Sequence, residues 1–97
     1  MQEERRLILK RDSDTHGALA EFHVYVDKKN YGNLAYGKTK IVPIDSSNHI
    51  VEVQGIFSDG IVKSKEYQVP AGEKDILYFV SQHMRMFVLE IVLHKAL

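Results

Sequence analysis

The sequence predicts a single all-β domain, an antiparallel β-sandwich of seven or eight strands. Glycine, proline and other turn residues interrupt the chain at short intervals, and the segments between them are rich in β-branched and aromatic residues. Apolar and polar residues alternate within these segments, as in strands that bury one face of a sheet. A chain of 97 residues can bury one core without help from disulfides, and it contains no cysteine. We therefore expect one β-sandwich over residues 6–97, preceded by a flexible tail of residues 1–5.

The first half of the chain contains four predicted strands. Leu7 and Leu9 share one face of the first strand. Phe22, Val24 and Val26 share one face of the second. The period of two therefore directs these side chains into the core. A proline near the end of the fourth strand removes a backbone donor, which favours a sheet edge for that strand. The four strands are expected at residues 6–11, 19–27, 31–34 and 38–44.

The second half contains the remaining predicted strands, at residues 49–57, 61–69, 74–80 and 84–94. A turn near residues 81–83 is then required between the last two. The alternative is a terminal helix, because no glycine or proline follows Glu73 and several apolar residues also fit a helical spacing. Strands are favoured because four apolar residues near the C-terminus alternate cleanly: Phe87, Leu89, Ile91 and Leu93.

Composition argues against several classes of function. Thirteen basic and thirteen acidic residues cancel, so no overall field attracts nucleic acid or an anionic membrane. No apolar run is long enough to span a bilayer. We therefore expect neither nucleic-acid binding nor membrane insertion. No signal peptide is recognisable, which slightly favours the cytoplasm and leaves the compartment unknown.

The middle of the chain carries a resemblance to a known family. A strand ends in a Tyr-Val-Asp-Lys turn at residues 25–28, and a short Gly-x-Leu strand follows at residues 32–34. A Gly-Lys turn comes next at residues 37–38, and a later strand, residues 49–53, opens with histidine. The arrangement resembles the small PEGA-like β-sandwich modules of bacteria, which are Ig-like in fold, over about residues 6–80. It departs from that pattern at Lys28, where the family prefers glycine, and at residues 47–48. The resemblance implies a non-enzymatic module without shared catalytic residues.

No catalytic or metal-binding pattern is present in the sequence. The histidines lack the short spacings of a zinc site, and no nucleophile elbow, phosphate loop or catalytic carboxylate pair is found. We therefore expect no enzymatic activity, no cofactor and no metal site. His49 lies on the apolar side of its strand and is expected to form hydrogen bonds near the core. The histidines are His16, His23, His49, His83 and His94.

One candidate ligand site is an aromatic and basic corner formed by Tyr25, Tyr31, Tyr36 and Lys38. Exposed tyrosines can stack on sugars or anchor a protein, and neighbouring lysines can bind an anion. In the alternative interpretation, the lysines protect a sheet edge and the tyrosines fill half-buried positions. If the chain binds a carbohydrate or another small ligand, we expect it at this corner.

The last predicted strand carries the stronger signal for a partner. Met84, Met86, Val88 and Val92 make its second face apolar, which a strand buried on one side does not need. Either this strand is central and buried on both sides, or its second face meets another chain. The sequence thus favours a binding or assembly module that self-associates through residues 84–94, as a homo-oligomer or with another protein partner.

Overall fold

The computed structural model describes residues 5–11, 20–57, 60–86 and 88–96, and all regular structure in this part of the chain is β-strand. Residues 12–19, with His16 and the start of the second predicted strand, most of the predicted tail, and Phe87 lie outside the described residues. The strands are β1 (Arg5–Arg11), β2 (Glu21–Val26), β3 (Lys29–Leu34), β4 (Thr39–Ile44), β5 (His49–Phe57), β6 (Gly60–Lys63), β7 (Tyr67–Val69), β8 (Ile76–Arg85) and β9 (Val88–Lys95).

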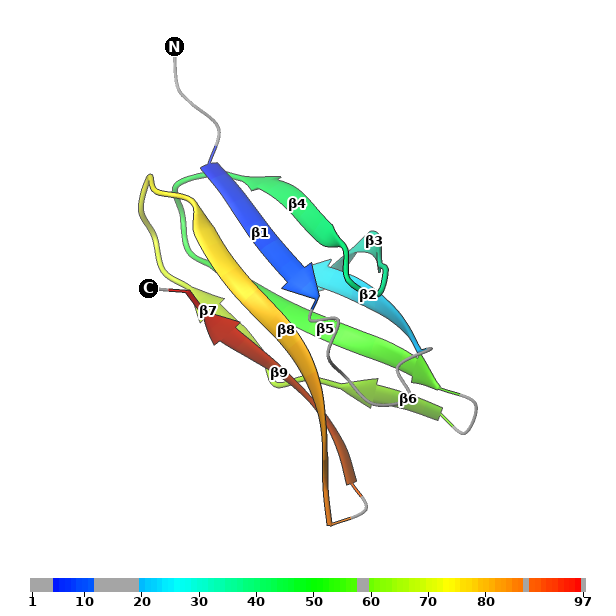
Figure 1. Cartoon of the computed structure of the whole chain (residues 1–97). Helices are drawn as coiled ribbons and strands as arrows, with labels where there is room; N and C mark the ends of the chain where they lie inside the picture. Colours follow the sequence, from blue (N-terminus) through cyan, green and yellow to red (C-terminus); the bar gives the residue numbers. More distant parts are fainter. Residues whose placement is uncertain (1–4, 12–19, 58–59, 87, 97) are drawn as a thin grey trace.

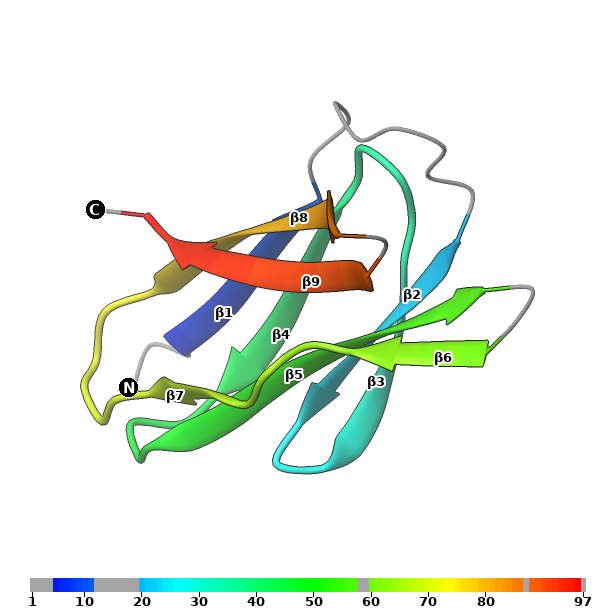
Figure 2. The ribbon, with the colours of Figure 1, turned by 90° about the horizontal axis from the view of Figure 1, so that it is seen from below.

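The strands form two sheets that lie face to face (Figures 1 and 2). Sheet A has the order β4-β1-β8-β9, and sheet B has the order β3-β2-β5-β6, with β7 also pairing with β5. The chain crosses between the sheets after β1, β3, β4 and β7, so neither sheet is built from one continuous segment. The prediction of an all-β fold is confirmed at this level.

Sheet A is not purely antiparallel, which corrects the sequence prediction, whereas all pairings of sheet B are antiparallel. β1 and β8 run parallel, with Leu7 opposite Ile76 and Arg11 opposite Val80. Parallel neighbours cannot be joined by a tight turn, and here the connection runs through sheet B. Local alternation in the sequence carries no information on such a distant pairing.

The core is formed where the inner faces of the two sheets meet. The five inward positions predicted in the first half of the chain are all almost completely buried: Leu7, Leu9, Phe22, Val24 and Val26. The apolar side of the fifth predicted strand, on which His49 lies, also faces the core, because Val51 and Val53 of β5 are fully buried. Apolar burial of this kind stabilises the fold by about 25 cal/mol for each Å² removed from water.

The described part of residues 74–94 consists mainly of β8 and β9 and contains no helix, so the alternative of a terminal helix is wrong. The predicted turn at residues 81–83 is also wrong, since β8 continues through this stretch to Arg85. The register places Arg85 opposite Val88, and the chain therefore reverses between these two residues. Met86 has φ = 48° there, a left-handed conformation that the sequence does not signal with glycine or asparagine.

The hairpin of β8 and β9 extends beyond the rest of sheet A. β1 pairs with β8 only as far as Val80, so residues 81–85 pair with β9 alone among the described strands. Figure 1 shows this two-stranded ribbon projecting away from both sheets. The described part of the molecule is accordingly elongated, with principal extents of 47 × 23 × 21 Å.

Two further differences concern the other strands. The predicted strand at residues 61–69 is divided into β6 and β7 by residues 64–66. β4, which contains Pro43, lies at the edge of sheet A, so the edge position expected from this proline is confirmed.

Candidate functional site

β9 has one backbone edge that does not pair with β8, and its register shows which residues form this free edge. Ala96 donates its backbone N–H to the carbonyl of Leu77 over 2.8 Å, and the pairing continues without a shift to Arg85 and Val88. Hydrogen-bonded and non-hydrogen-bonded pairs alternate in an antiparallel ladder. The backbone groups of Leu89 and Ile91 therefore point away from β8, toward the edge of sheet A.

The covered part of this edge lies nearer to the C-terminus. Leu93 donates its backbone N–H to the Tyr67 hydroxyl over 3.3 Å, so a side chain from sheet B covers the edge there. No other described strand pairs with β9 on this side. The stretch from Val88 to Ile91 thus presents strand backbone without a partner strand in the described part of the chain.

The outer face of sheet A carries apolar side chains from each of its four strands. Ile8 lies opposite Ile41 on one side and Leu77 on the other, and Phe79 is one step further along β8. Ile41 and Phe79 are among the exposed large apolar side chains, and Ile8 and Leu77 are half-buried. The apolar row spans β4, β1 and β8 and faces solvent, and on β9 the exposed His94 lies opposite Phe79.

The predicted interface residues lie on the hairpin but not on one face of one strand. Val88 and Val92 share the outer face of β9, and Val88 is 60% exposed whereas Val92 is half-buried. Met86 is 88% exposed at the reversal. Met84 belongs to β8 rather than to the last strand, and only its backbone is described. Ile91 and Leu93 face inward and are buried, as the alternation predicted.

The structure does not bring the three predicted tyrosines into one corner. Tyr25 lies on the outer side of sheet B, whereas Tyr31 packs against the core cluster. Tyr25 pairs with Asn30, so Tyr31, the next residue of β3, points to the opposite face of the hairpin. Tyr36 lies in the connection to β4, where the guanidinium of Arg11 is 5.7 Å from its ring centre. Lys38 is exposed in the same connection, and its carbonyl accepts the Arg11 backbone N–H.

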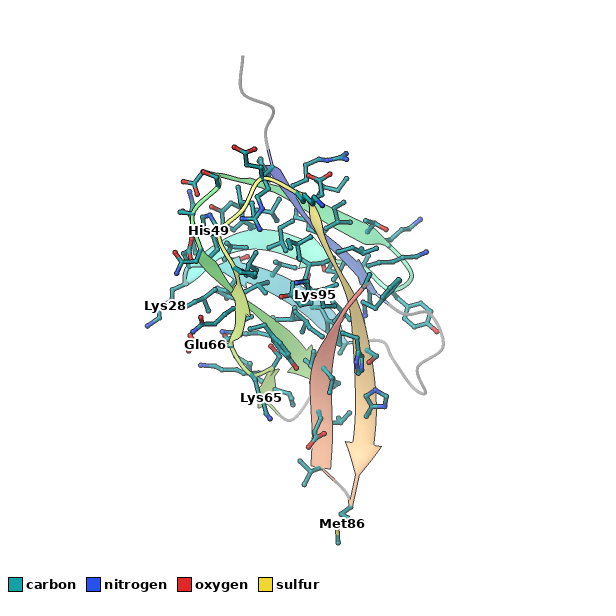
Figure 3. All side chains as sticks on the ribbon, turned by 90° about the vertical axis from the view of Figure 1, so that its left-hand side faces the viewer. Lys28, His49, Lys65, Glu66, Met86 and Lys95 are labelled. Carbon is teal, nitrogen blue, oxygen red and sulfur yellow. The ribbon has the colours of Figure 1, made fainter. Side chains whose placement is uncertain are left out.

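A shallow concavity of about 320 Å³ lies on the outer face of sheet B. It contains one residue of the predicted tyrosine corner, Tyr25, together with Lys28 of the turn after β2 and residues of β5, β6 and the segment before β7. Figure 3 shows Lys28 and Glu66 on the side of the molecule away from the tip of the hairpin at Met86. The lining residues are Tyr25, Lys28, Ile50, Glu52, Gln54, Lys63 and Glu66.

A bulge next to β5 forms one wall of this concavity. Gln54 pairs with Lys63 and Val51 with Tyr67, so two residues of β5 lie opposite three on the other side. Ser64 fills the gap, because it donates its N–H to the Val53 carbonyl and accepts the Val53 N–H at its hydroxyl. Bulges of this kind redirect the following side chains. Alternation alone could have identified Glu52 and Gln54 as outward residues, but the position of Glu66 depends on the bulge.

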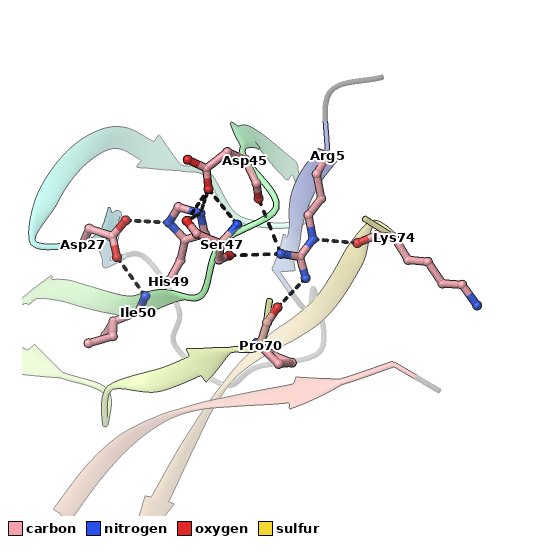
Figure 4. A network of polar contacts seen from close by, with 8 residues as sticks. All are labelled: Arg5, Asp27, Asp45, Ser47, His49, Ile50, Pro70 and Lys74. Carbon is pink, nitrogen blue, oxygen red and sulfur yellow. Dashed lines mark hydrogen bonds and ion pairs between the residues drawn. The ribbon is translucent and has the colours of Figure 1, made fainter. Parts of the chain in front are cut away.

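A polar cluster lies at the other end of β5 (Figure 4). The Nδ1 of His49 is 2.6 Å from Asp27 Oδ2, and its Nε2 is 2.8 Å from Asp45 Oδ1. Because ionised carboxylates only accept hydrogen bonds, both ring nitrogens donate and the imidazole is positively charged. Burial alone would lower the pKa of His49, but the bonds to Asp27 and Asp45 outweigh it and raise the pKa. The expected hydrogen bonding of His49 is thus present.

The two carboxylates of this cluster are held ionised by several donors. The bond from His49 lowers the pKa of Asp27, and the backbone N–H of Ile50 adds to this effect. The hydroxyl and then the backbone N–H of Ser47, followed by His49, lower the pKa of Asp45 to about 2. The cluster therefore joins the turn after β2 to the loop before β5 through ionic hydrogen bonds.

Arg5 crosses the same end of the molecule and is only 4% exposed. Its guanidinium donates to backbone carbonyls, at 2.7 Å to Pro70, 2.8 Å to Lys74, 3.3 Å to Ser47 and 3.5 Å to Asp45 (Figure 4). The side chain thereby ties β1 to the loops on both sides of it. The cluster and Arg5 have a structural role at this end, because their polar groups are directed at one another and at backbone.

Two general findings bear on the kind of site that is present. Within residues 5–11, 20–57, 60–86 and 88–96, no group of three histidine or acidic side chains is arranged to hold a metal ion. The described part of the chain also has no helix of the length and apolarity that would cross a membrane.

Comparison with known proteins gives one fold relationship. No protein-family model matches the chain, and no curated protein matches it. The structure is similar to the crystal structure of a non-hemolytic pneumolysin from Streptococcus pneumoniae strain ST306, with a TM-score of 0.53 and 13% sequence identity. The match covers 98% of this chain and 24% of the pneumolysin chain, so the chain spans about a quarter of that protein. At this identity the likeness concerns the fold alone, and the neighbour is not a PEGA module.

Proposed function

We propose that the chain is a non-enzymatic assembly module, an Ig-like and PEGA-like β-sandwich that self-associates through β9. The observation that carries this proposal is the open backbone edge of β9 at Leu89 and Ile91, next to the exposed apolar side chain of Val88. A second copy is the occupant, because two identical edge strands can pair antiparallel about a two-fold axis.

The contrast between β9 and the other described edge strands supports this proposal. Natural proteins protect sheet edges with proline, lysine, bulges or very short strands. β4 contains Pro43 and Lys40, β3 contains Lys29 and pairs through a register shift, and β6 is only four residues long. β9 is eight residues long, has an unbroken register, and has no lysine before Lys95.

The apolar outer face of sheet A supports the same site. The row through Ile8, Leu77 and Phe79 ends at His94 of β9, and the apolar positions farther along the outer face of β9 are Val92 and Val88. Val88 and Val92 lie on this face beside the edge. Burial of their side chains adds a hydrophobic contribution to the backbone hydrogen bonds of the paired edges.

Sedimentation equilibrium of the wild type and of a Val88→Lys/Val92→Lys variant tests the proposal. We expect the wild type to form dimers and the variant to weaken dimerisation at least about tenfold, since two charges would be buried without partners. The matched control is Ile56→Lys/Ile61→Lys, which makes the same charge change at exposed apolar positions of sheet B. A strictly monomeric wild type at about 1 mM, or equal effects of the two variants, overturns the proposal.

A Leu89→Pro variant distinguishes dimerisation by pairing of the β9 edges from dimerisation by packing of the outer faces of sheet A. The backbone N–H of Leu89 points away from β8, so Leu89→Pro removes a donor from the free edge and leaves the β8–β9 ladder intact. Loss of dimerisation in a variant that still unfolds cooperatively is the expected result. A Leu89→Ala variant controls for the lost side chain, and dimerisation that survives Leu89→Pro contradicts pairing at this edge.

A further inference from the structure

We propose that the concavity on the outer face of sheet B is a binding site for a short, uncharged saccharide. This inference is independent of self-association, because the site lies on sheet B and β9 belongs to sheet A. The concavity of about 320 Å³ is at the small end of the range of pockets that hold small molecules. It is open to solvent along one side of the molecule, as expected for a site that accepts one end of a longer chain.

The charges around the concavity indicate an uncharged ligand. Lys28 and Lys63 provide two positive charges, and Glu52 and Glu66 provide two negative charges. The four charges therefore cancel over the site, so they give no net electrostatic attraction to either an anionic or a cationic ligand. A ligand that bears hydroxyl groups instead of charges can bind to both kinds of side chain at once.

The hydrogen-bonding groups match hydroxyl groups in particular. Gln54 donates from Nε2 to Glu52 Oε1 over 2.8 Å, which orients both side chains on neighbouring outward positions of β5. This hydrogen bond leaves the amide oxygen and one amide N–H of Gln54, and the second carboxylate oxygen of Glu52, available to bind a ligand. Each sugar hydroxyl is both a donor and an acceptor, so adjacent hydroxyls can satisfy such a mixed set.

The apolar part of the lining suits the carbon face of a sugar ring. Tyr25 and Ile50 contribute the aromatic and aliphatic surface of the concavity. The amide of Asn30 donates to the Tyr25 hydroxyl at 3.5 Å, which helps to fix the position of the ring. Tyrosine combines an apolar ring with a polar end, a property that suits a ligand with hydroxyl groups around an apolar face.

The scaffold beneath these groups is rigid. Tyr25, Glu52 and Lys63 project from three hydrogen-bonded strands, and the bulge at Ser64 fixes the adjoining wall. Sites that are built on strands hold their side chains more accurately than sites on loops. The backbone of the site therefore needs little rearrangement to bind.

NMR titration of the ¹⁵N-labelled full chain tests the proposal. The probes are maltotriose, cellotriose and tri-N-acetylchitotriose, each added to about 10 mM, with N-acetylneuraminic acid as an anionic probe. We expect at least one neutral probe to shift amides around Tyr25, Ile50 and Gln54 in a saturable way. We also expect the anionic probe to bind at least about tenfold more weakly.

Variants assign the binding to this surface. Tyr25→Ala and Gln54→Ala should each weaken the affinity at least about tenfold, while Phe79→Ala, a matched aromatic control on the outer face of sheet A, leaves it unchanged. No saturable shift with any neutral probe overturns the proposal, as does tighter binding of the anionic probe. Equal effects of Tyr25→Ala and Phe79→Ala also overturn it. None of these outcomes depends on whether β9 forms a dimer.

Discussion

At the scale of single residues, the two arginines at the ends of β1 have the clearest structural consequence. Arg5 and Arg11 share the inward face of the strand with Leu7 and Leu9, and all four are buried. Arg5 is satisfied by carbonyls, whereas the guanidinium of Arg11 lies 3.6 Å above the centre of the Phe22 ring and donates to the Leu34 carbonyl. Burial lowers the pKa of Arg11. The guanidinium groups of Arg5 and Arg11 therefore cover the two ends of the core.

Replacing Arg5 and its neighbour Arg6 should have very different effects on stability. Arg5→Ala leaves buried carbonyls without donors and should lower the free energy of unfolding by about 3 kcal/mol. Arg6→Ala removes an exposed ion pair with Asp75 and should cost less than about 1 kcal/mol. Denaturant unfolding measures both. Similar losses for the two variants contradict the assigned role of Arg5.

The stability that His49 contributes should depend on pH with a maximum in mildly acidic solution. Its raised pKa means that its contribution is complete below about pH 6.5 and is lost as the pH rises through the folded-state value. The lowered pKa values of Asp27 and Asp45 mean that their contribution is complete above about pH 4 and is lost as the pH falls. Both contributions are therefore present between about pH 4 and 6.5.

Unfolding experiments on the wild type and His49→Gln across the pH range check this expectation. The difference in free energy of unfolding should be largest between about pH 4 and 6.5 and should decrease on both sides. Asp45→Asn should reduce the same difference, because one of the two partners of the imidazolium is neutralised. A difference that is constant from about pH 3 to 9 contradicts a charged His49.

At the scale of elements, the turn between β2 and β3 carries local strain that can be relieved. Asp27 and Lys28 both have positive φ, 52° and 69°, as in the two-residue turns that favour glycine at the second position. Lys28→Gly should therefore stabilise the chain by about 0.5–1 kcal/mol. Thermal or denaturant unfolding measures the gain. Lys29→Gly is the matched control in β3 and should be destabilising.

The close contact between β5 and β9 depends on the absence of a side chain at Gly55. A Cβ built there would lie 2.8 Å from Phe57 and 3.0 Å from both Ile91 and Phe22. Gly55→Ala should therefore cost about 1–3 kcal/mol of stability. The contact with Ile91 involves its Cδ1, so Ile91→Val in the same chain should recover part of the loss. A double-mutant cycle measures this coupling, and strict additivity contradicts it.

The sequence predicted elements with a strong local signal and missed those that depend on distant pairing. Inward residues such as Phe22 and Val24 follow from alternation, and the edge position of β4 follows from Pro43. The reversal at Met86 was missed because methionine carries no turn signal and because Ser81 and His83 looked more like turn residues. The sequence did not separate Tyr25 from Tyr31, because their faces depend on the register of β2 and β3: Tyr25 pairs with Asn30, so Tyr31 points to the opposite face.

At the scale of the whole molecule, charge balance should govern behaviour in solution. The formal net charge is zero at pH 7 and the isoelectric point is about 7.0. Colloidal repulsion is therefore weakest near neutrality. We expect a minimum of solubility and of the second virial coefficient near pH 7, and an increase toward pH 5.5 as histidines become charged. Static light scattering across this range checks it, and a minimum far from pH 7 is the contrary result.

The parallel pairing of β1 with β8 has a consequence for the order in which the chain can fold. Arg5 and Lys74, which meet across this pairing, are 69 residues apart in the sequence. When the ribosome has released β1, its central neighbour in sheet A has not yet been made. Sheet B can gather its strands earlier, whereas in sheet A β1 can pair with β4 but has no partner on its other side until β8 emerges. Distant contacts of this kind slow folding to about milliseconds or seconds. Sheet A can be completed only after β8 and β9, the last strands of the domain, have been synthesised.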